Sequence, residues 1–422
     1  MASLFFLIQR IANQLLIYIN IYIYIQIIIL MGNERALIAV NGCLHGDFAK
    51  LIPLLSENTK LLLLLGDLQL LSTKKDLSTC SIPYKYTYNG NIQKISDFHR
   101  ILKNDPKDEL AQKFNSINCV LGIGGNHENM GLLEKLPFGG FVTENFFYMG
   151  YCNIIKYNGM KIAGISGIHK PEDVFKEREY GFQKVASGDF NWWRRNKVTS
   201  YHVRFLEVLP LVLYEADEEN EEIDFVLSHD WPQNVFHNND PQLNERLFKI
   251  KPFFKTDVAS GKLGSRLYDL VMNNLRPSNW FSAHLHIKYK TTIEYENGDT
   301  TDFLALDKLL PNRLKDAISQ FEFPIEEEKE NEKSTIGNCS IELDLQFIKL
   351  QFWCYQNKQR ISQFFNSENM EYETIISQIK ELYLAEKNQI ELETPLLKPF
   401  VSADPLEYTN EYLKKNLNGI DL

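Results

Sequence analysis

Residues of the types that bind metal ions recur directly after short apolar runs of this sequence. They are Cys43, His45, Asp67, Asn126, His229, His284 and His286. Thiolate, imidazole, carboxylate and amide groups are the side chains through which proteins hold Zn²⁺, Fe²⁺ and Mn²⁺. Seven candidates are too many for one tetrahedral zinc ion, so the set suits two ions that share a bridging carboxylate. Two adjacent cations can clamp both the attacking and the leaving oxygen at phosphorus, which predicts phosphoester hydrolysis.

Asp67 is the expected bridging ligand, since the only other carboxylates beside these positions are Glu128 and Asp230. One pocket is predicted to contain His45, Asp67 and His286, with Cys43 beside it. The other is predicted to contain Asp67, Asn126, His229 and His284. His127 is left over as a proton donor, and we place it with Asn126 among the catalytic residues.

Each of these residues also has an ordinary structural explanation. A single cysteine after an apolar strand is usually a core residue, and an aspartate in Gly66-Asp67 could serve only a turn. The glycines of "GGNHE" (124–128) are not a phosphate loop, because no Lys-Ser or Lys-Thr follows them. "AHLH" (283–286) is more informative, because two histidines two residues apart in an extended chain point to the same side. All the candidates occupy one kind of position, and this favours a shared site.

The placement of these residues depends on a series of short apolar segments, which we predict to be β-strands. They are "RALIAV" (35–40), "KLLLLLGDLQ" (60–69), "NCVLGIGGNHE" (118–128), "MKIAGISG" (160–167), "IDFVLSHDWP" (223–232) and "NWFSAHLH" (279–286). Apolar strands that are bounded by glycine and alternate with helical stretches are typical of α/β domains whose sheets are covered on both faces. Such folds place their chemistry just beyond the carboxyl ends of the strands. The sequence therefore predicts an α/β fold with one composite site.

The chain has 422 residues and a formal net charge of −10. This length allows a large catalytic domain with a smaller appended part. The negative charge excludes a general attraction to nucleic acid, so RNA binding would need a local basic patch or bound cations. Residues 1–34 form an extension whose apolar run, 15–30, is short for a membrane span and is interrupted by polar residues. We expect a dispensable extension and no membrane contact, with a membrane anchor as the alternative.

Five motifs and their order resemble the calcineurin-like metallophosphoesterase superfamily. They are "GCLHGD" (42–47), "GDLQ" (66–69), "GGNHE" (124–128), "LSHDW" (227–231) and "SAHLH" (282–286). That superfamily normally begins with Asp-x-His, and Cys43 in place of the aspartate resembles one branch, the RNA lariat debranching enzymes. Further segments similar to that branch are "LPFGGFV" (136–142), "GISGI" (164–168), "YHVR" (201–204), "WFSAHLHIKY" (280–289) and "FLALDKLLP" (303–311). Together they extend over most of residues 35–314.

The resemblance implies a metallophosphoesterase-type αββα sandwich with an inserted recognition loop and a smaller, mostly helical C-terminal domain. It also implies hydrolysis of the 2′,5′-phosphodiester bond at the branch point of excised intron lariat RNA, which linearises introns for turnover in the nucleus. By position, the seven candidate ligands would be the metal residues, and His127 would protonate the leaving 2′ oxygen. The cofactors would be two divalent ions, with Fe²⁺ or Zn²⁺ expected and Mn²⁺ as a substitute. Asn41 and "ENMG" (128–131) depart from the family pattern, which leaves substrate contacts near residues 129–131 unassigned.

A thiol at position 43 is softer than the usual carboxylate, and it would shift that pocket away from Mg²⁺ and towards Zn²⁺ or Fe²⁺. Our hypothesis is that Cys43 tunes the choice of metal and is not a nucleophile. Two other functions stay open. One is a generic dinuclear metallophosphoesterase acting on phosphoproteins or small nucleotides, and the other is a non-catalytic binding module on the same fold. The complete set of ligand-type residues argues against the binding module, and Cys43 together with "SHDWP" (228–232) favours debranching over the generic activity.

Basic and aromatic residues are interleaved in the segment 169–200, between "GISGI" and "YHVR". Such a combination commonly binds single-stranded RNA, through phosphate pairing and base stacking. We predict that residues 166–200 form the lariat recognition loop implied by the resemblance. The candidate RNA contacts are Lys170, Arg178, Tyr180, Arg194 and Arg195. The alternative is a solvated excursion whose aromatic rings pack on the domain.

These observations divide the chain into four parts. We expect the extension at 1–34, the catalytic domain at 35–314, a charged linker at 315–333 that contains "EEEKENEK" (326–333), and a C-terminal domain at 334–422. The C-terminal part carries apolar and helical stretches but no candidate chemistry. The oligomeric state is left open.

Overall fold

The computed structural model describes residues 35–83, 95–215, 222–237, 241–325, 341–366 and 371–387. The predicted extension at 1–34, the acidic run at 326–333 and residues 388–422 lie outside these ranges. Within the described ranges, no helix combines the length and the apolar character needed to cross a membrane.

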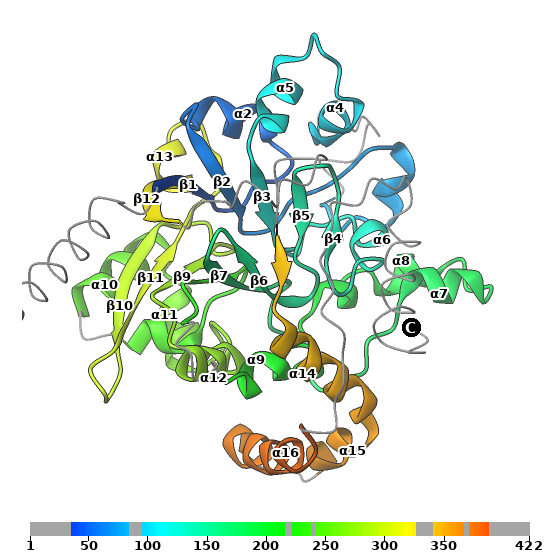
Figure 1. The fold of residues 1–422 in the computed structure, drawn as a ribbon, viewed down its shortest axis with the longest axis vertical. Coiled ribbons are helices and arrows are strands. Elements are labelled where there is room, and N and C mark those ends of the chain that lie inside the picture. The colour runs from blue at the N-terminus through cyan, green and yellow to red at the C-terminus, as the bar shows by residue number, and fades with distance from the viewer. Residues whose placement is uncertain are drawn as a thin grey trace, which may run out of the picture.

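A six-stranded sheet contains the first strands of the chain (Figure 1). Its strand order is β12-β1-β2-β3-β5-β4. The bounds are β1 Arg35–Asn41, β2 Thr59–Leu64, β3 Cys119–Gly122, β4 Gly140–Phe141, β5 Phe146–Tyr148 and β12 Ile318–Pro324. β1, β2, β3 and β5 run parallel, whereas the edge strands β12 and β4 are antiparallel to their neighbours. The residues that follow β1, β2 and β3 therefore meet at one edge of this sheet.

A seven-stranded sheet lies beside the first, with the order β10-β11-β9-β8-β7-β6-β13 (Figure 1). The bounds are β6 Cys152–Tyr157, β7 Met160–Ile165, β8 Phe225–Ser228, β9 Asn279–Ser282, β10 Tyr289–Glu294, β11 Thr300–Ala305 and β13 Glu342–Leu343. β7, β8, β9 and β11 are parallel, and β6, β10 and β13 pair antiparallel to their neighbours. The carboxyl ends of β8 and β9 carry the histidines of "SHDWP" and "AHLH".

Apolar side chains from both sheets form the central core. Ile38, Leu61 and Leu121 of the first sheet belong to one cluster with Ile162 and Phe281 of the second, and all five are almost fully buried. Neighbouring residues on the same strands belong to other buried clusters, because the outer faces of the sheets are covered as well. Covering on both faces explains why these strands are continuous apolar runs.

Helices cover the outer face of each sheet (Figure 1). On the first sheet they are α2 Phe48–Leu51, α4 Phe98–Lys103 and α5 Glu109–Asn115. On the second they are α9 Phe205–Leu213, α12 Arg266–Leu275, α14 Leu345–Gln356 and α16 Tyr372–Glu386. The other described α-helices are α6 Met130–Leu133, α7 Gly181–Ala186, α8 Trp192–Asn196, α10 Pro241–Ile250, α11 Phe254–Ala259, α13 Leu314–Ala317 and α15 Lys358–Gln363. The predicted α/β class is confirmed, and two mixed sheets between helices are compatible with a metallophosphoesterase-type fold.

The first sheet continues beyond the domain boundary predicted after residue 314. β12 pairs with β1 along its whole length, from Asn41 opposite Ile318 to Arg35 opposite Pro324. Phe321 and Phe323 in this strand pack against the central core. Alternation of polar and apolar residues is expected of a strand with one covered face. The first sheet therefore extends to residue 324 and takes in the first part of the predicted linker at 315–333.

The described residues between 341 and 387 pack onto the second sheet. β13 pairs with β6, and Phe347 and Ile379 belong to the same buried cluster as Trp280 and Phe303 of the sheet. Their helices α14, α15 and α16 therefore share the core of the second sheet instead of forming a separate one within the described residues.

Candidate metal centre

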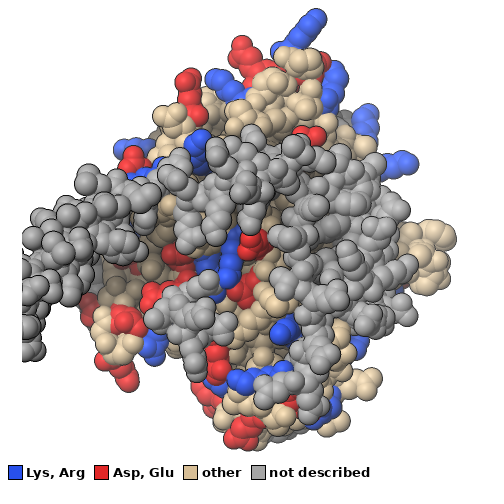
Figure 2. All heavy atoms as spheres, in the orientation of Figure 1, with Lys and Arg blue, Asp and Glu red and all other residues tan. Residues whose placement is uncertain are grey.

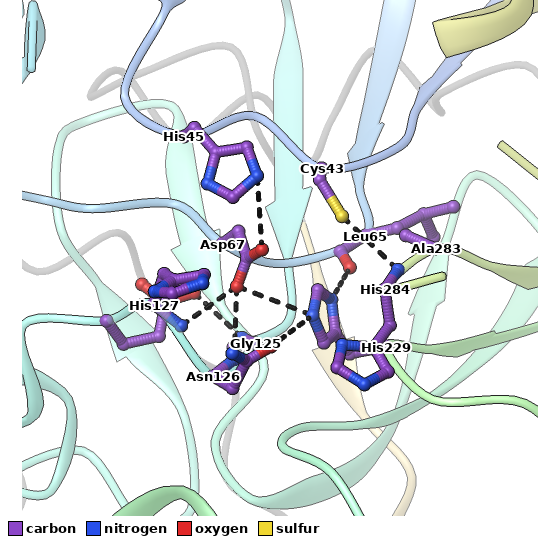
Figure 3. Close-up of polar contacts among 12 residues, drawn as sticks. Cys43, His45, Leu65, Asp67, Gly125, Asn126, His127, His229, Ala283 and His284 are labelled. Atoms are coloured by element: carbon purple, nitrogen blue, oxygen red, sulfur yellow. Dashed lines mark hydrogen bonds and ion pairs between the residues drawn. The ribbon is translucent and has the colours of Figure 1, made fainter. Parts of the chain in front are cut away.

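Five loops deliver the predicted site residues to one place, each from the carboxyl end of a strand (Figure 3). β1, β2 and β3 of the first sheet lead to Cys43 and His45, to Asp67, and to Asn126 and His127. β8 and β9 of the second sheet lead to His229, and to His284 and His286. All eight residues are therefore brought together where the two sheets meet.

The ligand-bearing loops adopt backbone conformations that are uncommon for their residue types. His45, Asp67, His284 and His286 have φ values of 51°, 53°, 58° and 51°. Each left-handed residue other than glycine costs about 1–3 kcal/mol, and such strain concentrates at functional sites. Gly66 has a φ of 100° and lies against the ring of His229, where an added Cβ would collide. The backbone is thus shaped for presenting these side chains.

Four side chains form a compact group at the first pocket. The ligand atoms of Cys43, His45, Asp67 and His286 all lie within 4.8 Å of one another. The Nε2 atoms of His45 and His286 are 3.2 Å apart, and His45 Nε2 is 3.5 Å from Asp67 Oδ2. Cys43 is fully buried, and its Sγ accepts a hydrogen bond of 3.2 Å from the amide of His284. The group corresponds to the first predicted pocket, with Cys43 among its members.

The donor atoms of this group fit a divalent cation. Asp67 Oδ2 is buried and has no hydrogen-bond partner in the described part of the chain, which is costly for a carboxylate oxygen. Burial lowers the pKa of His45, and it lowers the pKa of His286 to about 3. Both rings are therefore neutral near pH 7 and can offer lone pairs to a cation. Burial, and next the charge of Asp67, raise the pKa of the Cys43 thiol, an effect that a bound cation would oppose.

A second group surrounds the other carboxylate oxygen of Asp67 (Figure 3). His229 Nε2 lies 3.4 Å from Asp67 Oδ1 and 3.3 Å from the side-chain oxygen of Asn126. His229 Nδ1 donates to the carbonyl of Leu65 at 2.6 Å, which fixes the tautomer and leaves Nε2 free of a proton. The ring centroid of His284 is 5.1 Å from that of His229. These residues are the ones predicted for the second pocket.

Asp67 faces both groups at once, with Oδ2 toward His45 and Oδ1 toward His229. Oδ1 also accepts hydrogen bonds from the amides of Asn126, at 3.1 Å, and His127, at 2.9 Å. Burial alone would raise the pKa of this carboxyl, but the neighbouring imidazoles and the amide of His127 hold it well below its usual range. A permanently ionised carboxylate with its two oxygens aimed at different groups has the geometry of a bridging ligand.

His127 is oriented by a backbone carbonyl. Its Nδ1 donates to the carbonyl of Ser81 at 2.6 Å, and its ring centroid is 5.4 Å from that of His45. With Nδ1 engaged, Nε2 is the nitrogen available for proton transfer at the site.

Glu128 joins two of the ligand loops, a role that was not predicted from the sequence. Its Oε1 accepts from the amides of Leu68, at 2.8 Å, and Gly125, at 2.7 Å, and its Oε2 accepts from the amide of Gln69 at 3.1 Å. Glu128 thereby ties the loop of Asp67 to the loop of Asn126. Burial, reinforced by the charge of Asp67, raises its pKa to about 8. The feature of the sequence that could have indicated this role is the position of Glu128 directly after Asn126-His127 in a glycine-rich turn.

Gln69 is a second residue that sequence analysis missed. Its side-chain amide nitrogen lies 3.3 Å from Nδ1 of His45, on the opposite side of the ring from Asp67. A contact at Nδ1 fixes the orientation of a ligating imidazole. No spacing rule in the sequence predicts this contact, because it depends on the fold of the loop after β2.

Arg178 and Tyr180, two of the five predicted RNA contacts in residues 166–200, have buried side chains that contact other residues of the protein. Arg178 is buried, pairs with Glu207 through Nε and Nη2, and stacks over the ring of Tyr151 at 3.8 Å. Tyr180 is 8% exposed and packs in a small cluster with Met130 and Tyr151. Their side chains therefore hold the segment on the domain.

The other three predicted contacts, Lys170, Arg194 and Arg195, are exposed. Arg195 forms a surface ion pair with Asp189, with Nη2 2.5 Å from Oδ2. Phe190 nearby is 78% exposed, which is unusual for a large apolar ring.

Lys and Arg alternate with Asp and Glu on the described surface near α4 and α5, as Figure 2 shows.

The two-sheet fold and the cluster at its strand ends define an α/β protein with a candidate metal centre, which is compatible with a metallophosphoesterase-type fold. No known family model matches the chain. The chain is similar to lariat debranching enzyme A of Xenopus laevis, with 35% identity over 292 residues, and to the lariat debranching enzyme of Homo sapiens, with 34% identity over 292 residues. It is also similar to the lariat debranching enzyme of Saccharomyces cerevisiae, with 36% identity over 263 residues.

These matches cover 65%, 65% and 61% of this chain, and 48%, 48% and 58% of the three relatives. The chain thus spans about half the length of the curated relatives it matches. The resemblance stated from the motifs is confirmed, and the chain is related to the lariat debranching enzymes.

Proposed function

We propose that this protein hydrolyses the 2′,5′-phosphodiester bond of branched RNA with the help of two divalent metal ions. The observation that carries the proposal is Asp67, which presents its two oxygens to separate groups of ligand-type side chains. The similarity to lariat debranching enzymes supports the choice of substrate. Linearisation of excised introns, and residence in the nucleus, belong to the same proposal.

The ions would be held by the seven predicted ligands, with Asp67 shared between the pockets. When bound, they supply positive charge that neutralises the phosphate and activates water for in-line attack. The fixed tautomer of His229 and the low pKa of His286 keep both rings ready as neutral ligands. The buried thiol of Cys43 supports a preference for Fe²⁺ or Zn²⁺ at the first pocket, with Mn²⁺ as a substitute.

His127 is the proposed proton donor to the leaving 2′ oxygen. Its Nδ1 is held by the carbonyl of Ser81, so a proton on Nε2 would face the space next to His45. A carbonyl acceptor at Nδ1 holds the ring in one orientation, so that Nε2 can serve as the donor in general acid catalysis. Asn126 would assist by orienting the phosphate through its side chain beside His229.

Residues 166–200 are the proposed lariat recognition loop. The exposed cations Lys170, Arg194 and Arg195 would contact phosphates, and the exposed ring of Phe190 offers a surface for stacking a base. Glu134 accepts hydrogen bonds from the amides of Gly181 and Phe182, at 3.0 and 2.6 Å, and fixes the start of α7. A local basic surface of this kind would allow an acidic protein to bind RNA.

The test is a comparison of three substrates with purified, metal-loaded protein. They are a branched RNA with one 2′,5′ linkage, a linear 3′,5′ RNA of the same sequence, and a small chromogenic phosphodiester. We expect cleavage of the branched RNA at the 2′,5′ linkage only, and a loss of about 100-fold or more in Asp67→Asn. Cleavage of the chromogenic ester alone would replace the proposal with a generic metallophosphoesterase activity.

A further inference from the structure

Residues 79–81 run antiparallel to residues 127–129 and form a short backbone support for His127. Cys80 and Asn129 form an antiparallel bridge, and the amide of Ser81 donates to the carbonyl of Glu128 at 3.3 Å. Thr79 Oγ1 donates to the side-chain oxygen of Asn129 at 2.8 Å. The carbonyl of Ser81 is also the acceptor for Nδ1 of His127. The position of the His127 ring therefore depends on where this support lies.

The side chains of Lys197 and Tyr201, which are distant in the sequence, also contact residues 79–81. Lys197 Nζ donates to the carbonyl of Cys80 at 3.3 Å. The half-buried phenol of Tyr201 lies beside the side chain of Ser81, where burial raises its pKa and the contact with Ser81 opposes that rise. Lys197 directly follows α8 near the end of the proposed recognition loop, and Tyr201 is the first residue after that loop.

The backbone that carries Lys197 and Tyr201 is itself firmly placed. The carbonyl of Tyr201 accepts from the amide of Ile168 at 3.2 Å, and the guanidinium of buried Arg178 donates to the carbonyl of Ser200. The guanidinium of Arg204 donates to the carbonyl of Thr199 at 3.1 Å. A displacement of the backbone at residues 197–201 would therefore also displace residues 79–81.

We propose that Lys197 and Tyr201 are positioning residues for His127, and that they couple the RNA-binding segment to the orientation of the proton donor. The inference rests on the proposed function, because it gives His127 a catalytic role. Proton transfer requires hydrogen-bond reach between donor and leaving oxygen, and a misplacement of about 1 Å can cost about 100-fold in rate. Lys197 and Tyr201 act through Cys80 and Ser81 without needing to contact substrate.

The experiment is a double-mutant cycle in the full chain. Lys197→Met and Tyr201→Phe should each lower kcat on branched RNA by about 10-fold, with KM within about twofold of the wild-type value. Metal content and melting temperature should remain those of the wild type. In a His127→Ala background, neither substitution should lower kcat further, because the ring that they position is gone. Lys113→Met is the matched control, since Lys113 is an exposed lysine in α5, outside the proposed recognition loop and the site.

Three results would overturn the inference. A rise in KM at unchanged kcat would make Lys197 and Tyr201 substrate contacts. Equal losses with and without His127 would show that they act on stability or on another group, and wild-type kcat in both variants would show that the contacts are unimportant. Failure of the proposed function is seen separately, as a wild-type protein that cleaves only the chromogenic diester, and the same cycle can then be run on that ester.

Discussion

The Nε2 atoms of His45 and His286 lie 3.2 Å apart, although 241 positions separate the two residues in the chain. His45 follows β1 of the first sheet, and His286 follows β9 of the second. Two neutral imidazoles can share one N–H···N hydrogen bond at this distance, and both residues adopt a positive φ to bring the nitrogens together. Their position beside Cys43 and Asp67 fits a shared divalent cation.

Cys43 offers the first prediction, because a thiol has taken the place of a hard ligand in the first pocket. In Cys43→Asp, the preference of the enzyme should move from Zn²⁺ or Fe²⁺ toward Mn²⁺ and Mg²⁺, since carboxylate oxygens suit the harder ions. The measurement is activity of metal-free protein after reconstitution with each ion in turn.

The control for this change is Cys152→Ala, at a buried cysteine in β6 that belongs to the core beneath the second sheet. It should leave the order of metal preference unchanged. If Cys43→Asp also keeps that order, Cys43 does not tune the choice of metal.

Much of the site could be predicted because it depends on a general property of parallel sheets. Asp67, His229 and His286 were assigned to one site from their positions after apolar strands, and the two sheets do bring them together. Glu128 and Gln69 could not be assigned in the same way. Their roles arise from amides and ring nitrogens that come into range only after the loops fold.

Two differences between the predictions and the structure have equally specific causes. Arg178 was predicted to contact RNA because basic residues beside aromatic ones resemble an RNA-binding surface, yet burial against Tyr151 and Glu207 uses the same residue types. β12 was assigned to the linker, although its alternating pattern is that of an edge strand. Composition does not distinguish a linker from an edge strand, because the residues that cover one face of the strand are remote in sequence.

The second prediction concerns pH and the metal-free protein. Burial lowers the pKa of His229 to about 4, against about 6.5 for an unfolded histidine. Between these values the unfolded state binds a proton that the folded state does not, so the free energy of unfolding falls as pH falls from about 6.5 to about 4. The fully buried ring of His229 should account for a fall of about 3 kcal/mol in the free energy of unfolding over this pH range. Denaturant unfolding in the presence of a chelator, at several pH values, measures it.

Other groups oppose this effect, so the comparison must be made with a variant. Burial raises the pKa of Glu134 and of Asp269 to about 7, and such carboxyls favour folding as pH falls. At each pH, subtracting the unfolding free energy of His229→Gln from that of the wild type cancels the contributions of Glu134 and Asp269. A difference between the two proteins that does not change from pH 6.5 to pH 4 would contradict the assignment of a neutral, buried ring.

The third prediction tests the connection that Glu128 makes between the loops of Asp67 and Asn126. Glu128→Ala leaves the amides of Leu68, Gly125 and Gln69 without their acceptor, and each buried unpaired amide costs about 1–3 kcal/mol. We expect a loss of about 3 kcal/mol or more in unfolding free energy and fewer metal ions bound per chain. Denaturant titration and elemental analysis report the two effects.

A matched change is Glu144→Ala, at an exposed glutamate, which should alter stability by no more than about 0.5 kcal/mol. Glu128→Gln keeps one carbonyl oxygen and should be intermediate in both measurements. Full metal binding by Glu128→Ala would mean that the two loops hold their geometry without this carboxylate.

The fourth prediction separates the buried and exposed basic residues of the segment 166–200. Arg178→Met leaves Glu207 as a buried charge without its partner, which costs about 3–5 kcal/mol, so activity on every substrate should fall with stability. Arg194→Met removes an exposed charge, so stability should stay within about 0.5 kcal/mol while KM for branched RNA rises and cleavage of a small diester is unchanged. Melting curves and kinetics on both substrates distinguish the two variants.

The double variant Arg178→Met/Glu207→Leu decides whether the loss in Arg178→Met comes from the unpaired charge. Removing both partners takes away the uncompensated carboxylate, so the double variant should be more stable than Arg178→Met alone. If Arg178→Met instead kept wild-type stability and weakened only RNA binding, the guanidinium would contact substrate, as the sequence first suggested. The buried pair would then be a resting arrangement that opens when RNA binds.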